Sequence, residues 1–105
     1  MFFTSVLRRC RITLFTRTTC GLCDTAKDVL HQLQKTRPFD LEQVNLSAPG
    51  TQAWKDLYDF DVPVIHIAKA GAPPETPKGA SKAVKLMHRL APAEVEAKMD
   101  MVEAQ

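Results

Sequence analysis

The sequence lacks long apolar runs and contains little cysteine. Its longest apolar stretches cover only a few of the 105 residues, whereas a helix needs roughly 20 apolar residues to cross a bilayer. We therefore expect no membrane span. The three cysteines are too few for the disulfide framework of a small secreted domain, and an odd number leaves one thiol unpaired. This cysteine usage favours a reducing or redox-controlled compartment.

Neither sign of charge is in large excess. Lys and Arg number 14 against 12 Asp and Glu, which gives a formal net charge of +2. The chain has no cluster of basic residues interleaved with aromatic ones, as a nucleic-acid-binding surface would require, so no nucleic-acid partner is expected. A content of 45% hydrophobic and 25% charged residues is typical of a soluble globular domain, and this length suits one compact domain.

We place that domain at residues 11–105, after a basic lead at residues 1–10. Residues 1–11 contain arginine and hydroxyl side chains but no acidic residue, a bias shared with mitochondrial targeting segments. A solvated lead-in to the first strand explains the same composition, and we prefer that interpretation. The expected locations are the cytoplasm and the mitochondrion.

The first half of the domain predicts a strand, a helix and a second strand. Residues 11–16 are rich in β-branched and aromatic residues without alternation, which indicates a strand covered on both faces. From Gly21 onward, apolar residues recur at helical spacing until Pro38 ends the pattern. Residues 41–46 predict the second strand, and the helical crossover makes the two strands parallel neighbours.

The second half predicts a third strand at residues 62–67 and further helices. Trp54 and Tyr58 lie at helical spacing, and we interpret them as core residues rather than a substrate platform. A passage rich in glycine and proline at residues 70–77 leads from the third strand toward a short antiparallel partner. A helix is then expected over residues 81–90, with Ser81 as its N-cap, and a terminal helix after Pro92.

The cysteine pair lies where the first strand meets the first helix. A thiol at a helix N-terminus faces unpaired backbone N–H groups and the positive end of the helix dipole, which favour the thiolate. We therefore predict Cys20 as a nucleophile of lowered pKa, with Arg17 adding positive charge. Cys23 stands three residues later on the same face and is the predicted resolving cysteine. Gly21 permits close approach to the substrate sulfur, and Leu22 presents an apolar side chain.

A zinc knuckle or a pair of structural thiols is the alternative to redox chemistry. Zinc needs two further ligands, and the chain has no second Cys-X-X-Cys and no recognisable Cys and His spacing. We therefore expect no metal. Cys10 is interpreted as a small, partly buried residue at the strand's edge, and His66 as a half-exposed strand residue.

Two segments together resemble the glutaredoxin and thioredoxin superfamily, over about residues 11–90: T-L-F-T-R-T-T-C-G-L-C and D-V-P-V-I-H-I. The resemblance implies a thioredoxin-like α/β fold, with a central four-stranded mixed sheet flanked by helices. It implies a redox disulfide between Cys20 and Cys23. It also implies that Val62 and a cis Pro63 face the substrate, and that Arg17 is the basic residue three positions before the nucleophile.

The resemblance implies a thiol-disulfide oxidoreductase of glutaredoxin-like type. Such a protein reduces protein or glutathione mixed disulfides as a monomer, in electron transport and cell redox homeostasis. It holds no cofactor tightly and takes glutathione as a cosubstrate. Gly79-Ala80-Ser81-Lys82 stands where glutaredoxins have a Gly-Gly and acid cluster for glutathione, so N–H groups at the start of the expected helix, with Lys82, are candidate carboxylate ligands.

Two rival functions remain. One is a glutathione-dependent iron-sulfur cluster carrier, in which Cys20 of two subunits and glutathione hold the cluster. The other is a redox-inert binding module that keeps the fold.

Overall fold

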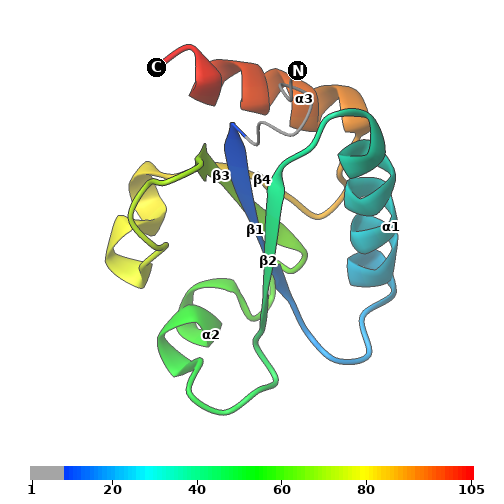
Figure 1. The fold of residues 1–105 in the computed structure, drawn as a ribbon. Coiled ribbons are helices and arrows are strands. Elements are labelled where there is room, and N and C mark those ends of the chain that lie inside the picture. The colour runs from blue at the N-terminus through cyan, green and yellow to red at the C-terminus, as the bar shows by residue number, and fades with distance from the viewer. Residues whose placement is uncertain (1–8) are drawn as a thin grey trace.

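The computed structural model describes residues 9–105 and folds them around one four-stranded sheet (Figure 1). The strands are β1 (Cys10–Thr16), β2 (Asp40–Asn45), β3 (Val64–Lys69) and β4 (Val84–Met87), and their order in the sheet is β2-β1-β3-β4. β1 pairs parallel with β2 and antiparallel with β3, and β4 completes the sheet antiparallel to β3. The predicted mixed sheet of four strands with flanking helices is confirmed.

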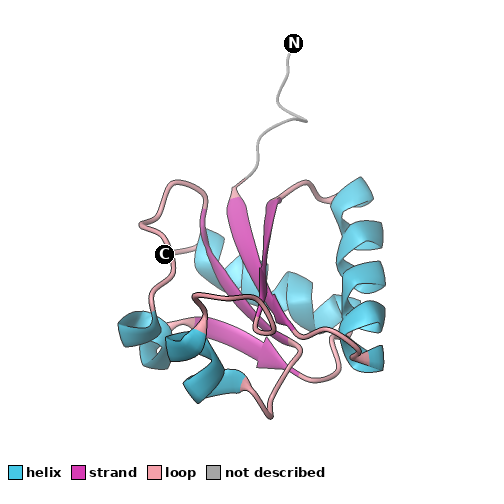
Figure 2. Cartoon of the chain, turned by 90° about the horizontal axis from the view of Figure 1, so that it is seen from below, coloured by secondary structure: helices cyan, strands magenta, loops and turns pink. Residues whose placement is uncertain are grey.

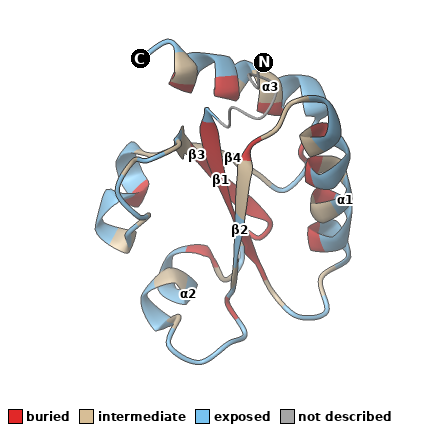
Figure 3. Cartoon of the chain, in the orientation of Figure 1, coloured by how far each residue is buried: buried red, intermediate tan, exposed pale blue. Residues whose placement is uncertain are grey.

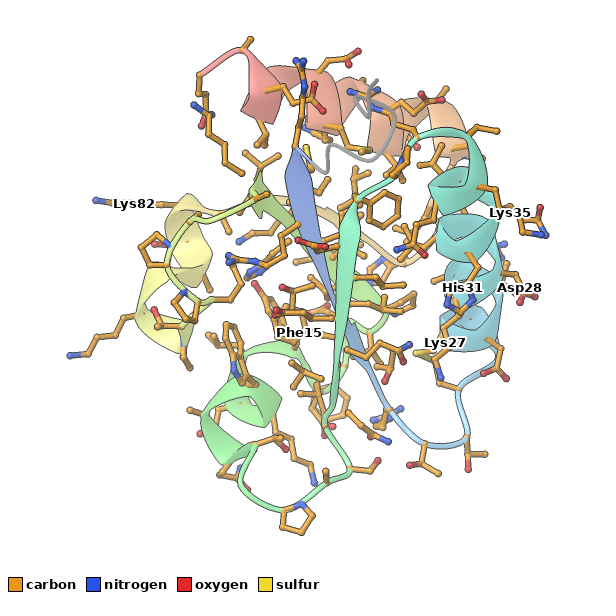
Figure 4. All side chains as sticks on the ribbon, in the orientation of Figure 1. Phe15, Lys27, Asp28, His31, Lys35 and Lys82 are labelled. Carbon is orange, nitrogen blue, oxygen red and sulfur yellow. A yellow bond between two sulfur atoms is a disulfide. The ribbon has the colours of Figure 1, made fainter. Side chains whose placement is uncertain are left out.

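Helix α1 (Gly21–Thr36) connects the two parallel strands, as predicted. It buries Cys23, Ala26, Leu30 and Leu33, which lie three or four residues apart on one face. Charged side chains lie on its outer face, including Lys27 and Lys35 (Figure 4). The helix stops before Pro38, because a residue that precedes proline avoids helical geometry.

The sheet is covered on both faces (Figures 1 and 2). Even-numbered residues of β1, such as Leu14, pack with α1 and with α3 (Pro92–Glu103). Odd-numbered ones, such as Phe15, face α2 (Gln52–Tyr58) and the 3-10 helix η2 (Pro77–Lys82) (Figure 4). Every residue of β1 is therefore buried, which confirms the predicted two-sided strand (Figure 3).

The terminal helix α3 confirms the helix predicted after Pro92. It buries Val95, Met99 and Val102 against the sheet. Ion pairs from Arg37, the C-cap residue of α1, hold it in place, since the guanidinium contacts the carboxylates of Glu96, Asp100 and Glu103. No helix within residues 9–105 combines the length and the apolar content that a membrane crossing requires.

The helix predicted at residues 81–90 is wrong. Four of these residues form β4, and η2 precedes it, with Thr76 rather than Ser81 as the N-cap. The free edge of β3 explains the difference, because β4 pairs its backbone with that edge, from Val84 opposite Ile67 to Met87 opposite Val64. A short apolar run fits both helical and strand spacing, and tertiary pairing decides between them. β4 is thus the expected short antiparallel partner of the third strand.

Two burial predictions are also wrong. His66 is not half-exposed but only 1% exposed, because β3 is an inner strand and α2 and η2 cover that face. Cys10 is fully buried as the first residue of β1, under α3. Tyr58 is buried and Trp54 packs against the same cluster, so both belong to the core as predicted. The lead predicted at residues 1–10 lies mostly outside the described residues.

Candidate active site

Cys20 and Cys23 form a disulfide at the start of α1, with their Cα atoms 5.2 Å apart. Cys20 is the N-cap residue, with extended backbone (φ −134°, ψ 106°), and its Sγ accepts the backbone N–H of Cys23 at 3.2 Å. A side chain that accepts an N–H of the first helical turn satisfies one of the helix's unpaired donors. The sulfur of Cys20 thus lies at the positive end of α1.

The two sulfur atoms differ in accessibility. Cys20 is half-buried at the surface, whereas Cys23 is almost fully buried beneath it, in the core cluster of Phe15 and Leu46. A substrate can therefore meet Cys20 but cannot reach Cys23 directly. Cys23 Sγ is bonded to Cys20 and is shielded from solvent.

The cis peptide bond between Val62 and Pro63 follows the expectation drawn from the resemblance. Val62 belongs to the same cluster as Cys23, and Cys20 packs against that cluster. The carbonyl of Pro63 accepts the backbone N–H of His88 at 2.7 Å, which ties this segment to the loop after β4. The structure therefore brings Cys20, Cys23 and Val62 together.

The other predicted site residues lie around this pair. Arg17 does not stand alone, because its Nη1 donates to the carbonyl of Asp59 at 2.9 Å and contacts its Oδ1 at 3.3 Å. Its charge is thus partly compensated. A Cβ atom on Gly21 would meet nothing within 4 Å, so the space in front of it is open. Leu22 is 39% exposed.

The prediction of a carboxylate site near Lys82 is wrong, because the helix start on which it rested does not exist. Gly79 to Lys82 belong to η2, which lies before β4, and no α-helix begins there. The Lys82 side chain extends away from the sheet (Figure 4). Residues 88–91 form the loop between β4 and α3. Together with Leu22, Val29 and Glu94, this loop lines a cavity of about 230 Å³. Sequence reasoning missed this loop because it assigned His88 to a helix.

Two residues near the cysteine pair have left-handed backbones, although neither is glycine. Thr19, immediately before Cys20, has φ 58°, and His88 has φ 67°. This region costs an L-residue about 1–2 kcal/mol, and more for a β-branched side chain such as threonine. The surrounding structure therefore holds strained backbone immediately before Cys20 and in the loop that is hydrogen-bonded to Pro63, which no sequence pattern indicated.

A buried polar network lies on the α2 face of the sheet. His66 Nδ1 is 2.7 Å from Glu75 Oε1, and its Nε2 is 2.7 Å from the Tyr58 hydroxyl. Glu75 also pairs with Arg11 at 2.8 Å. A carboxylate only accepts, so Nδ1 carries the proton and donates to Glu75, while Nε2 accepts from Tyr58. Tyr58 connects this network to the cluster that contains Cys23.

Burial sets the protonation of the network. It lowers the pKa of His66, and the opposing hydrogen bond and charge of Glu75 do not compensate for it. Burial, followed by the charges of Asp61 and Glu75, raises the pKa of Tyr58. Both side chains are therefore neutral near neutral pH. Within residues 9–105, no three His, Cys, Asp or Glu side chains gather in an arrangement able to hold a metal ion.

The mixed sheet, the Cys-X-X-Cys disulfide at the start of α1 and the cis proline beside it define a thioredoxin-fold protein with a paired-cysteine site. Residues 11–100 match the family model of the Glutaredoxin-like domain (DUF836). The chain belongs to that family. The predicted membership of a glutaredoxin-like group within the thioredoxin-fold superfamily is confirmed.

Solved structures share the fold. Chloroplastic thioredoxin z is 19% identical with a TM-score of 0.66, and the match covers 92% of this chain and 80% of that one. Oxidized thioredoxin O2 from Arabidopsis thaliana is 16% identical with a TM-score of 0.61, over 90% and 76%. Protein Ne2328 from Nitrosomonas europaea is 23% identical with a TM-score of 0.60, over 87% and 91%. Because the sequence identities are this low, the similarity shows that these proteins share a fold and shows nothing about a shared function.

Proposed function

We propose that this chain is a thiol-disulfide oxidoreductase that reduces protein or glutathione mixed disulfides through Cys20 and Cys23. The observation that supports the proposal most directly is the position of the two sulfurs. One is accessible and capped by a helix N–H, and the other is buried and paired with it. Structural disulfides need no such division between an outer and an inner sulfur.

The proposed reaction begins with the reduced pair. The Cys20 thiolate attacks one sulfur of the substrate disulfide, a mixed disulfide forms, and the other substrate sulfur leaves as a thiolate that takes a proton. Cys23, deprotonated, then attacks Cys20 and releases the second substrate thiol. Two electrons have passed to the substrate, and the Cys20–Cys23 disulfide is the oxidised product.

The N–H of Cys23 supports the first step, because it donates to Cys20 Sγ and stabilises the thiolate more than the thiol. In this scheme a polypeptide or glutathione pairs with the backbone of Val62, next to the cis Pro63. Glutathione is the proposed cosubstrate, since two glutathione molecules restore the dithiol and leave as glutathione disulfide. The protein acts as a monomer in this scheme and serves cell redox homeostasis in the cytoplasm or the mitochondrion.

Two assays with cysteine variants test the proposal. One couples reduction of a glutathionylated peptide to glutathione and glutathione reductase, and the other couples reduction of a protein disulfide to thioredoxin reductase. We expect Cys20→Ser to abolish turnover in both. Cys23→Ser should keep part of the glutathione-coupled activity and accumulate a covalent adduct with the protein substrate, because the resolving step is lost.

Cys10→Ser is the matched control, because Cys10 is buried on the opposite face of the sheet from the α2 cluster and should leave both rates unchanged. Turnover by Cys20→Ser at the wild-type rate would refute the assignment of the nucleophile. Activity of the wild type in one assay alone identifies its electron donor.

A further inference from the structure

Phe60 is the most exposed large apolar side chain within residues 9–105. It is 91% exposed, whereas Met101, the next in order, is 51% exposed. A single exposed leucine is ordinary on a protein surface, but a large aromatic side chain left almost entirely in water is less so. Phe60 is also close in sequence to the candidate active site, because it precedes the cis Pro63 by three residues.

The exposure of Phe60 does not come from a loosely held loop. The N–H of Asp59 donates to the carbonyl of Lys55 at 3.0 Å, and the N–H of Asp61 donates to that of Tyr58 at 2.9 Å. Arg17 holds Asp59 through both its carbonyl and its carboxylate. The residues on each side of Phe60 are therefore anchored while its ring remains free of the core.

The same anchors connect the residues around Phe60 to the segments that carry the redox pair. Arg17 stands three residues before Cys20, and Val62, two residues after Phe60, packs in the cluster under Cys20. On the α1 side, Leu22 of the Cys-X-X-Cys segment is itself exposed. Residues 59–63 and the Cys-X-X-Cys segment, which meet in the cluster of Val62 and Cys23, therefore each carry an exposed apolar side chain.

We propose that Phe60 is a docking residue for polypeptide disulfides and contacts an apolar side chain near the cysteine that Cys20 attacks. This inference rests on the proposed oxidoreductase function and adds a contact that only its polypeptide substrates can make. A small disulfide has no side chain that reaches from Cys20 to Phe60. A peptide extended along Val62 does, because such a segment advances about 3.3 Å per residue. Burial of the ring at that contact supplies the favourable free energy.

A matched set of substrates tests the proposal with the full chain. Two synthetic peptide disulfides differ only in leucine or asparagine on either side of the cysteine, and bis(2-hydroxyethyl) disulfide is the small substrate. Values of kcat/KM are compared for wild type, Phe60→Ala and Phe60→Leu, with dithiothreitol as the common reductant. Met101→Ala is the control variant, because Met101 is an exposed apolar residue on α3.

We expect Phe60→Ala to lower kcat/KM about tenfold for the leucine peptide, the loss typical of truncating an aromatic contact residue. The asparagine peptide and the small disulfide should change by less than about twofold, and Phe60→Leu should restore part of the loss. Met101→Ala should behave as wild type.

Other outcomes overturn the proposal in distinguishable ways. Equal losses on all three substrates would make Phe60 a residue that positions the cysteine pair. If Phe60→Ala had the wild-type kcat/KM on all three substrates, Phe60 would have no role in docking. A wild-type dimer that Phe60→Ala converts to a monomer, measured by sedimentation, would assign the ring to a second copy of the chain. Absence of wild-type turnover on every substrate would instead refute the oxidoreductase function itself.

Discussion

The backbone N–H of Cys23 donates to the Sγ atom of Cys20 at 3.2 Å, so the two cysteines are joined by a hydrogen bond as well as by their disulfide. Reduction breaks the covalent bond but leaves the helix, and hence this donor, in position. The N–H group then faces a thiol or a thiolate. Because a hydrogen bond to the charged form is the stronger one, it favours the thiolate.

Cys20 should therefore have a lowered pKa in the reduced protein. A free cysteine titrates at about 8.5, and a thiol at a helix N-terminus titrates at about 3.5–7.5. The measurement is the pH dependence of the alkylation rate by iodoacetamide in Cys23→Ser, which removes the second thiol but keeps the N–H donor. A midpoint at or above the free-cysteine value would show that the helix start does not stabilise the anion.

Cys10 should be inert under the same conditions. Burial, followed by the hydrogen bond to Glu103, raises its pKa to about 11, so the thiolate is scarce near neutral pH and is shielded from solvent. Mass analysis of the reduced wild type after brief alkylation should find label on Cys20 and none on Cys10. Addition of denaturant should expose Cys10 to the reagent. Labelling of both residues at similar rates in the native protein would contradict its burial.

Thr19→Gly should stabilise the protein. Glycine adopts φ 58° without the clash that threonine meets there, so we expect a gain of about 1 kcal/mol in the free energy of unfolding. Thr25→Gly is the same chemical change inside α1 and should cost about 0.5 kcal/mol. Urea denaturation of the reduced proteins measures both. A loss of stability in Thr19→Gly would mean that its side chain supports the turn.

His66 should make stability depend on pH in mildly acidic solution. Its folded-state pKa lies below the ordinary value, so the unfolded chain takes up the proton first as the pH falls through about 6.5. The contribution of His66 to the free energy of unfolding is fully present above that pH and is lost as the pH falls toward the folded-state pKa. The slope contributed by one such proton is at most about 1.4 kcal/mol per pH unit.

The comparison variant is His66→Gln, which keeps a polar side chain but cannot titrate. The free energy of unfolding, measured by urea denaturation at several pH values between neutral and mildly acidic, should fall more steeply with decreasing pH for the wild type than for the variant. Equal pH dependence in the two proteins would place the folded-state pKa of His66 at its unfolded value and would argue against the effect of burial.

Local patterns in the chain were enough to predict β1, α1 and the final helix. The spacing of the apolar residues Ala26, Leu30 and Leu33 predicts a helix that packs its apolar face on a sheet. The cysteine pair was equally predictable, because the end of the first strand and the start of the helix were both visible in sequence. Capping at Cys20 is a local property of three or four residues.

Interactions between distant segments settled the rest. Residues 84–87 could form a helix or a strand by their own spacing, and the free edge of β3 selected the strand. The same pairing removed the helix start near Lys82 and placed His88 next to Pro63, although 25 residues separate them in the chain. The burial of His66 likewise depends on α2 and η2 covering its face of the sheet.

By itself, the sequence determined which two sulfurs can meet, since residues three apart at a helix start face the same way whatever surrounds them. Only the tertiary structure decided which sulfur is accessible, which side chains surround it and that Phe60 remains in solvent. Periodicity reports which face of an element is apolar. Exposure depends on what other elements cover that face, and this depends on contacts that are remote in sequence.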